Sequence, residues 1–478
     1  MWQSVYLLLF AILHESFAFE IYWNVPSVQC KKVRPDLYNI TANKDRRFWG
    51  DKFVIFYEPD IGLYPWCEPG PNDVINKCQN AINGGVPQKV NMQEHLAKVR
   101  LDVARAIPNP DYDSLAIIDF ERWRPLFDLN WSNRNVYKQY STKLVMDQYP
   151  TLNRNTATYV ARFLFDKAAK EFIVKTIETA REDFPLCNYD VGYGNDLECK
   201  PEYGILNEQL LWIFNASDII IPPAYFYKEN YSPELRQKHV YAKIAQAEEI
   251  NKLLYPKTLP IYLYVKMEYA VELNETSGSL INPFYSKSDV CNSIKFPYDM
   301  GVHGVIIWST SNYMKKRCEP MANFVDNVIG PFSQAVVHKA SKCSQKQCNG
   351  NGRCAMVDRL PLAKCELAYQ PETKCICDEP YTGKHCDKLA SSSTEPEVLS
   401  TTSPMSTVVE TSTDGATSPM LIVAEQAAST DGATEPMTTR ETTFATTHNP
   451  ITSTPTVKSK QDFTISVKAR LYTFHHDE

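Results

Sequence analysis

The stretch Leu115-Ala116-Ile117-Ile118-Asp119-Phe120-Glu121-Arg122-Trp123 ends a short apolar run in two acids and an indole. Residues 115–118 predict a short buried strand. Side chains of a strand point alternately to opposite faces, so we expect Asp119, Glu121 and Trp123 to share one face. Paired acids at the end of a buried strand indicate that these acids are either solvated or functional.

The chemistry that this pair favours is acid catalysis on a sugar. Adjacent carboxylates resist ionising together, so one keeps its proton to higher pH and can act as a general acid. A flat Trp123 beside them would stack on a sugar ring. The alternative is that both acids form ordinary surface salt bridges with Arg122 and Arg124, and the spacing alone does not decide between the two interpretations.

Residues 20–335 are predicted to form one large α/β domain. Short apolar segments typical of buried parallel strands alternate with helical stretches, and the length suits a distorted (β/α) TIM-like barrel. The predicted helices span 162–181 and 240–254. The predicted strands span 53–57, 115–118, 218–221, 261–265 and 304–308.

The predicted strands place several chemically useful side chains at one end of the domain. In parallel barrels the active site lies at the carboxyl ends of the strands. The residues at or just after these ends are Tyr57, Asp119, Glu121, Tyr225 and Trp308. Each aromatic residue alone is explained by packing at the core or rim, but their shared position favours a common site.

The sequence has the features of a secreted, extracellular protein. Residues 1–18 resemble a signal peptide, with an apolar stretch at 5–13 that is too short to span a bilayer, and we expect no membrane span elsewhere. A formal net charge of -6 argues against a nucleic-acid partner. Five N-glycosylation triplets begin at Asn39, Asn130, Asn215, Asn230 and Asn274.

The 14 cysteines fall into two sets, seven from Cys30 to Cys318 and seven from Cys343 to Cys386. Disulfides are the expected state in an oxidising compartment. The second set lies in residues 340–388, which resemble an EGF-like domain in Cys375-Ile-Cys377 and in Tyr381-Thr-Gly-Lys-His-Cys386. That resemblance implies the pairs Cys343–Cys354, Cys348–Cys375 and Cys377–Cys386; a zinc site is the alternative.

Residues 389–478 are predicted to be a disordered, mucin-like low-complexity tail rich in Ser, Thr and Pro. The octapeptide that begins at Thr413 recurs in similar form at Thr430. Residues 463–474 alternate like a strand, and the sequence assigns no function to them.

Together these pieces resemble the animal hyaluronidases, glycoside hydrolase family 56. The resemblance covers residues 20–335 and is carried by three motifs, to which the EGF-like module adds the arrangement of vertebrate and venom-type members. The motifs are Ile118-Asp-Phe-Glu-Arg-Trp-Arg-Pro125 with Asn130-Trp131, Phe56-Tyr57 with Gly62-Leu-Tyr-Pro65, and Gly304-Val-Ile-Ile-Trp308 with Cys318.

The resemblance implies an endo-β-N-acetylhexosaminidase without a metal or other cofactor, and we expect the protein to be a monomer. Its substrates would be hyaluronan and chondroitin, cleaved at β-1,4 bonds next to N-acetylglucosamine, with the acetamido oxygen of the substrate attacking the anomeric carbon. Glu121 would be the general acid and then the general base, and Asp119 would orient the acetamido group. Tyr57, Tyr225 and Trp308 match positions that line the acetamido subsite.

Two positions depart from the family pattern. Lys243 stands where the family has an Arg, which keeps the charge but loses the bidentate fork. In the family, the helix that here ends near Arg181 is followed by a strand with a substrate-binding Tyr, whereas here only Glu182-Asp-Phe-Pro-Leu186 precedes Cys187. An interior strand is therefore expected to be missing, through a truncated splice form, local re-pairing of strands, or a real loss of activity.

The resemblance also implies Cys30–Cys318 and Cys187–Cys199, while Cys67 and Cys78 are close enough to pair locally. One cysteine then remains in each module. We expect the two to form a Cys291–Cys365 bridge between the modules.

Two other functions stay open. A chitinase-like hydrolase would need the run D-x-x-D-x-D-x-E, but positions 117 and 118 are Ile. A glycan-binding or structural protein would keep the fold without turnover, as the missing strand suggests. For an enzyme, we expect deletion of the tail after Lys388 to leave turnover intact.

Overall fold

The computed structural model describes most of the chain up to residue 390 and one segment near its end. The described residues are 18–68, 78–109, 112, 114–183, 201–226, 231–269, 271–272, 274, 281, 284–359, 365–390 and 467–470. The predicted signal peptide 1–18 therefore lies almost wholly outside the described residues, as do Cys187, Cys199 and Asn230.

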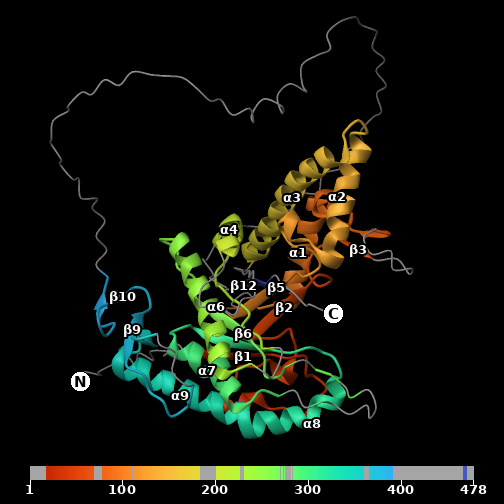
Figure 1. The fold of residues 1–478 in the computed structure, drawn as a ribbon. Helices are drawn as coiled ribbons and strands as arrows, with labels where there is room; N and C mark the ends of the chain where they lie inside the picture. Colours follow the sequence, from red (N-terminus) through yellow and green to blue (C-terminus); the bar gives the residue numbers. More distant parts are fainter. Residues whose placement is uncertain are drawn as a thin grey trace, which may run out of the picture. The chain divides into compact units, whose positions relative to one another are not determined.

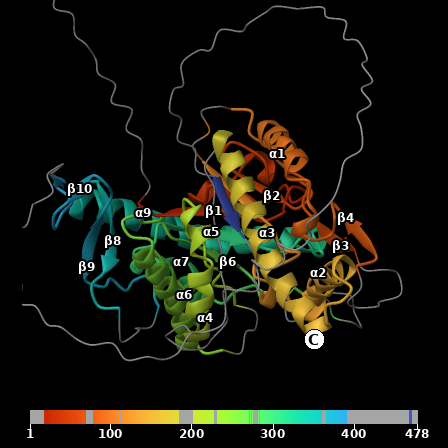
Figure 2. The same ribbon diagram turned by 90° about the horizontal axis from the view of Figure 1, so that it is seen from above.

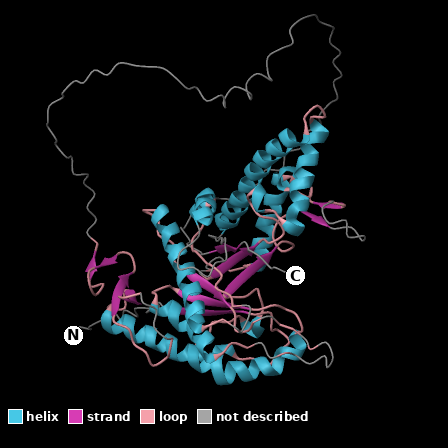
Figure 3. Cartoon of the chain, viewed as in Figure 1, coloured by secondary structure: helices cyan, strands magenta, loops and turns pink. Residues whose placement is uncertain are grey.

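Helices and strands alternate over the large N-terminal part (Figures 1 and 3). The helices are α1 Met92–Ala106, α2 Asn135–Gln148, α3 Arg154–Asp183, α4 Pro201–Gln209, α5 Leu211–Asn215, α6 Pro233–Leu253, α7 Lys287–Asp299, α8 Met314–Phe324 and α9 Gly330–Gln347. The strands are β1 Glu20–Asn24, β2 Phe53–Tyr57, β3 Trp66–Glu68, β4 Asn80–Ile82, β5 Leu115–Asp119, β6 Tyr262–Val265, β7 Gly304–Trp308, β8 Gly352–Met356, β9 Thr373–Cys377, β10 Tyr381–Thr382, β11 Lys388–Leu389 and β12 Val467–Arg470.

The first parallel sheet has the order β12-β5-β2. β2 pairs with β5 from Phe53 opposite Leu115 to Tyr57 opposite Asp119. On its other edge β5 pairs in parallel with β12, a strand that comes from the far end of the sequence (Figure 1). The sequence boundary at 389 is therefore wrong for residues 467–470, which belong to this sheet and not to a structureless tail.

The second parallel sheet has the order β1-β7-β6. β1 and β7 approach closely at Gly304, where an added Cβ atom would lie 2.2 Å from the carbonyl oxygen of Glu20, so only glycine fits. Beside β6, the predicted strand 218–221 forms only an isolated bridge, Ile220 to Ile261, and a second isolated bridge, Pro223 to Tyr264, follows it. Pro222 and Pro223 explain this correction, because proline has no N–H to continue a ladder.

The two sheets share one buried cluster, which we call the inner core. Alternate residues of each strand contribute to it, as expected for one face of a pleated strand. Its buried members are Tyr22, Phe53, Ile55, Leu115, Ile117, Ile219, Ile221, Tyr225, Tyr262, Tyr264 and Ile306, with Phe48, Tyr57 and Trp308 packed at its margin. The opposite faces of the strands and the helices form a second, larger cluster.

Side-chain caps fix where several helices begin. Asn91 accepts a hydrogen bond from the backbone N of Glu94 at the start of α1, and Ser286 accepts one from Asp289 at the start of α7. Ser232 caps α6 in the same way, and Pro233 follows it at the first helical position. These local signals determine where the helices start relative to the strand ends.

Six disulfides are formed among the described residues. They are Cys30–Cys318, Cys67–Cys78, Cys291–Cys365, Cys343–Cys354, Cys348–Cys375 and Cys377–Cys386. All six are pairs expected from the sequence. The cysteines of the last three disulfides form a small buried cluster, to which the antiparallel strands β8 and β9 contribute.

The cysteine-rich region is joined to the large α/β part by more than its chain connection. α9 runs across the expected boundary near residue 340 without a break. Arg353 donates a hydrogen bond to the carbonyl oxygen of Gly301 at 2.6 Å, and Arg359 forms an ion pair with Glu248 at 2.6 Å. With the Cys291–Cys365 disulfide, these contacts tie the two parts together.

The exposure of the glycosylation triplets differs. Asn39, Asn215 and Asn274 are exposed. Asn130 has no exposed surface, and its side-chain nitrogen donates to the carbonyl oxygens of Arg124 and Leu126 at 2.9 and 3.0 Å. The predicted glycan at Asn130 is therefore wrong, because the amide is used inside the fold. Of the helices in the described ranges, none is both long and apolar enough to cross a bilayer.

Candidate active site

Three of the predicted site residues lie at the carboxyl ends of the parallel strands around the inner core. Tyr57 ends β2 and stands opposite Asp119, which ends β5, while Trp308 ends β7. Asp119 continues the alternation of Leu115 and Ile117, so it lies at the end of the inner-core face of β5. Its side chain has no exposed surface. The alternative interpretation, in which Asp119 forms surface salt bridges with Arg122 and Arg124, is therefore excluded for Asp119.

The backbone on both sides of Glu121 is held by charged side chains. The carboxylate of Glu58 accepts hydrogen bonds from the backbone N atoms of Glu121 and Arg122 at 2.8 and 3.0 Å. The carbonyl oxygen of Glu121 accepts from Arg124 at 2.9 Å and from Arg134 at 3.1 Å. Charge-assisted bonds are stronger than neutral ones, so the position of Glu121 beyond β5 is well determined.

Tyr225 and Trp308 form an aromatic platform at the inner core, with Tyr225 inside that cluster and Trp308 at its margin. Their ring centroids are 5.7 Å apart with an interplanar angle of 28°, a stacked arrangement. The ammonium of Lys266, just after β6, lies 5.6 Å from the Tyr225 centroid and 5.3 Å from the Trp308 centroid. The ammonium group therefore makes cation–π contacts with both rings, and this part of the site offers flat apolar faces together with a positive charge.

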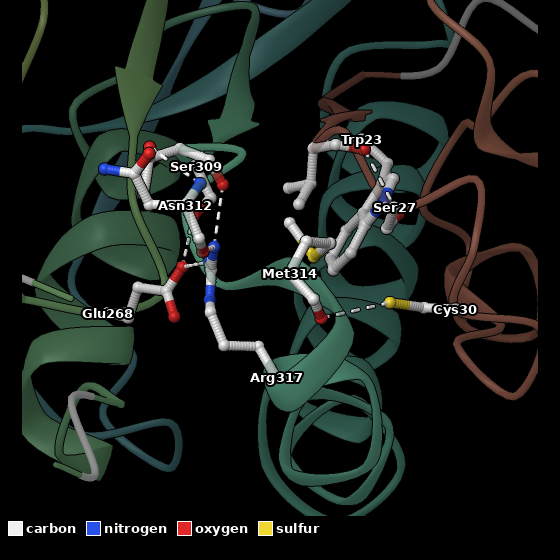
Figure 4. Close-up of polar contacts among 10 residues, drawn as sticks. Trp23, Ser27, Cys30, Glu268, Ser309, Asn312, Met314 and Arg317 are labelled. Atoms are coloured by element: carbon white, nitrogen blue, oxygen red, sulfur yellow. Dashed lines mark hydrogen bonds and ion pairs between the residues drawn. The ribbon is translucent and has the colours of Figure 1, made fainter. Parts of the chain in front are cut away.

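A buried ion pair supports the residue after Trp308. The side chains of Glu268 and Arg317 are paired and have no exposed surface, and both bond to the hydroxyl of Ser309 (Figure 4). Arg317 also donates to the carbonyl oxygens of Thr310 and Asn312 at 2.7 and 2.9 Å. This network holds the chain that follows β7.

Burial and charge act in opposite directions on Arg317. Desolvation lowers the pKa of its guanidinium from the ordinary value, and the charge of Glu268 opposes that shift. The network is therefore matched in charge, and removing either partner would leave the other buried without compensation.

Trp123 does not lie with the acids. It has no exposed surface, its indole N–H donates to the carbonyl oxygen of Pro65 at 2.9 Å, and its ring stacks on Tyr64 at 5.2 Å. β5 ends at Asp119, so the alternation of a strand does not continue to residue 123. The expected sugar-stacking role of Trp123 is therefore wrong; it is a core residue.

Lys243 is buried on α6, so the structure places it on the helix that the resemblance indicated. Glu182, in the short segment expected to replace the missing strand, belongs to helix α3. Sequence reasoning missed Glu58 and Lys266. Each directly follows a predicted apolar strand, so the signal was the same one that identified Asp119.

Known proteins with similar sequences share an activity class. A family model described as hyaluronidase matches residues 11–393. A chondroitin hydrolase of Caenorhabditis elegans is 30% identical over 77% of this chain and 80% of that protein. A hyaluronidase of Loxosceles intermedia is 27% identical over 77% of this chain and 94% of its own length, and hyaluronidase-1 of Homo sapiens is 28% identical over 75% and 82%.

The fold is also similar to a solved structure. The crystal structure of bee venom hyaluronidase in complex with a hyaluronic acid tetramer superposes with a TM-score of 0.56 at 26% identity. The match covers 66% of this chain and 98% of that chain. The two chains therefore share a mixed α/β fold.

Proposed function

This chain belongs to the hyaluronidase family, glycoside hydrolase family 56, and we propose that it is a secreted endo-β-N-acetylhexosaminidase of hyaluronan and chondroitin. The observation that carries this proposal is that Tyr57 and Asp119 end paired strands, while Tyr57 and Trp308 both pack at the margin of the inner core. Relatives named for both substrates support the pair of polysaccharides.

The fold that we propose is a distorted (β/α) barrel. Alternate residues from β1, β2, β5, β6, β7 and the 219–225 segment share the inner core, as the strands of a closed barrel do. Active sites of such barrels lie at the carboxyl ends of the strands, where Asp119 and Trp308 are found.

The first chemical step uses the substrate as its own nucleophile. The carbonyl oxygen of the acetamido group bonds to the anomeric carbon, while the bond from that carbon to the leaving oxygen breaks. The carboxyl group of Glu121 transfers its proton to the leaving oxygen. Asp119 is held in a buried position and orients the acetamido N–H. It also stabilises the positive charge that develops on the new ring, which the acetamido oxygen closes within the substrate.

The second step returns the enzyme to its starting state. Glu121, now a carboxylate, takes a proton from water as the water oxygen bonds to the anomeric carbon. The bond to the acetamido oxygen breaks, so the product keeps the configuration of the substrate. Each proton that Glu121 gives in the first step is recovered in the second.

The binding residues that we propose surround the acetamido group. Tyr57, Tyr225 and Trp308 supply flat apolar faces, and Trp308 packs against the acetamido methyl group. Lys243 and Lys266 add positive charge near a substrate whose alternate sugars carry carboxylates. No metal or other cofactor takes part in this scheme.

We propose that residues 340–388 are an EGF-like module that stabilises the catalytic part rather than acting in chemistry. Three disulfides hold its small core, and Cys291–Cys365 anchors it. The set of disulfides suits an extracellular protein.

The test is reducing-end release from hyaluronan and from chondroitin by the secreted full-length protein, compared with Glu121→Gln. The substitution removes the transferable proton with little change in shape, so turnover should fall by about 10²- to 10⁴-fold. Glu249→Gln, at an exposed carboxylate, is the matched control and should keep full activity.

Near wild-type turnover in Glu121→Gln would refute the assignment of the acid. Polysaccharide binding without turnover by the folded wild-type protein would instead favour the glycan-binding alternative. Retention of the hyaluronan configuration at the new reducing end, measured by NMR, tests the proposed stereochemistry.

A further inference from the structure

The strand β12 comes from a part of the chain that the family match does not cover. The match ends at residue 393, whereas β12 is Val467–Arg470. It pairs with β5 from Val467 opposite Ala116 to Arg470 opposite Asp119. The carboxyl end of β12 therefore reaches the level of the buried acid at the end of β5.

β5 needs a neighbour on this edge. All five of its residues are buried, and β2 pairs with only one of its two edges. Backbone N–H and C=O groups that are buried without hydrogen bonds cost free energy, and an open sheet edge is an aggregation site. A strand at the position of β12 meets both requirements.

The sequence does not favour a strand at the place in the chain order where this neighbour is usually found. In an alternating α/β fold a strand should follow α3 and precede the 219–225 segment that bridges to β6. Residues 184–200 contain Pro, Gly, Asn and Asp between isolated apolar residues, a composition that disfavours a strand. β12 also contacts α3, beside which Figure 2 shows it as the blue arrow.

The sequence around β12 has the pattern of a strand. Apolar and polar residues alternate from Phe463 to Leu471, in contrast with the Ser/Thr/Pro-rich residues before them. We propose that β12, Val467–Arg470, is a donated strand of the catalytic sheet, which inserts beside β5 within the same chain and completes the site at Asp119.

The linker permits this insertion within one chain. Residues 391–466 could span up to about 250 Å when extended, and lengthening a flexible loop adds only slowly to the entropy of closure. A tethered segment also meets its own sheet at an effective concentration of about millimolar, which favours its own chain over a second copy in dilute solution.

The first experiment is hydrogen exchange of the backbone amides of Leu115–Asp119 in two equally long deletions. Removal of residues 462–478 should make those of these amides that face β12 exchange at least about tenfold faster, because that edge of β5 loses its partner. Removal of residues 420–436 shortens only the linker and should leave their exchange unchanged. This measurement does not depend on the proposed enzymatic function.

Proline substitutions localise the effect to the strand. Neighbouring N–H groups of a strand point to opposite edges, so Lys468→Pro or Ala469→Pro must remove a donor that faces β5. One of the two should reproduce the faster exchange and lower turnover at least about tenfold. Ala445→Pro, the same substitution as Ala469→Pro but in the linker, should change neither.

Add-back of a synthetic peptide of residues 462–478 separates loss of the strand from general misfolding. The peptide in excess should restore both protection of β5 and turnover to the 462–478 deletion. The turnover readout rests on the proposed function. If the peptide restores protection of the β5 amides but neither the wild-type protein nor the deletion variant has turnover, the result contradicts the proposed function and not the donated strand. Unchanged exchange of Leu115–Asp119 in the 462–478 deletion would overturn the donated strand, and a dimer that exchanges strands between copies would overturn insertion within one chain.

Discussion

The substitution Arg317→Met tests how the buried network holds the chain after β7. Met has a similar length but no charge, so the carboxylate of Glu268 would remain buried without its partner. Breaking a buried pair in this way costs about 3–5 kcal/mol of unfolding free energy. The carbonyl oxygens of Thr310 and Asn312 also lose their donor, which places the expected loss at the upper end of that range.

The double variant Glu268→Met/Arg317→Met gives the sharper expectation. Removing both charges leaves no uncompensated ion, so the double variant should be more stable than Arg317→Met alone. Arg34→Met is the matched control, because Arg34 forms an exposed ion pair with Asp36 at 2.7 Å. Its loss should leave the unfolding free energy nearly unchanged, because solvent screens an exposed ion pair.

The assay is guanidinium unfolding followed by tryptophan fluorescence, with the Michaelis constant for hyaluronan measured on each folded variant. Ser309 follows Trp308, so loss of the network should also raise the Michaelis constant by moving the aromatic platform. Equal stability of Arg317→Met and Arg34→Met, or a double variant less stable than Arg317→Met, would refute this reasoning.

Three further predictions follow from burial. Trp123→Ala should lower the unfolding free energy by about 3–5 kcal/mol because it empties a core position, whereas Trp308→Ala should mainly reduce turnover. Thermal melting and kinetics of both variants distinguish these effects. A Trp123→Ala variant that is stable but inactive would contradict the assignment of Trp123 to the core. Burial lowers the pKa of His95 from 6.5 to about 4, so between these pH values the unfolded chain binds a proton that the folded chain does not. The unfolding free energy should therefore fall by about 3 kcal/mol as the pH drops from 6.5 to 4. In His95→Gln, chemical denaturation across this range should show the loss of this contribution to the pH dependence of stability. Glycopeptide mapping should find Asn215 modified and Asn130 bare, and a glycan on Asn130 would contradict its buried position.

The strands could be predicted wherever a run of buried apolar residues was continuous. β2 and β7 have the predicted bounds, and β5 is longer by Asp119 alone. The 218–221 run failed because a local apolar pattern does not show that the following prolines interrupt pairing. Local sequence signals thus predicted where strands lie in the chain better than which strands pair with one another.

The site was predictable in its strand-end residues and not beyond them. Asp119 and Trp308 were found because the last residue of a strand keeps the alternation of that strand. Trp123 was misplaced because the chain leaves the strand after Asp119, a turn that alternation cannot show. Glu58 and Lys266 directly follow strands too, but their contacts come from distant parts of the chain.

β12 shows the same limit at larger scale. The alternation of residues 463–474 indicated a strand, but the composition around it indicated a tail. A pairing partner that lies in residues 115–119 leaves no trace in the local sequence. The expectation that the tail after Lys388 is dispensable followed from that gap, and the pairing of β12 with β5 argues against it.

The Cys30–Cys318 bridge affects how the chain matures during synthesis. Its two cysteines are 288 residues apart, whereas Cys67 and Cys78, which follow Cys30, are only 11 apart. Cys30 therefore meets oxidant together with these two neighbours long before Cys318 is made. Any early bond between Cys30 and either neighbour must be exchanged before the native bridge can form, so the yield of native protein depends on disulfide isomerisation more than on the rate of oxidation.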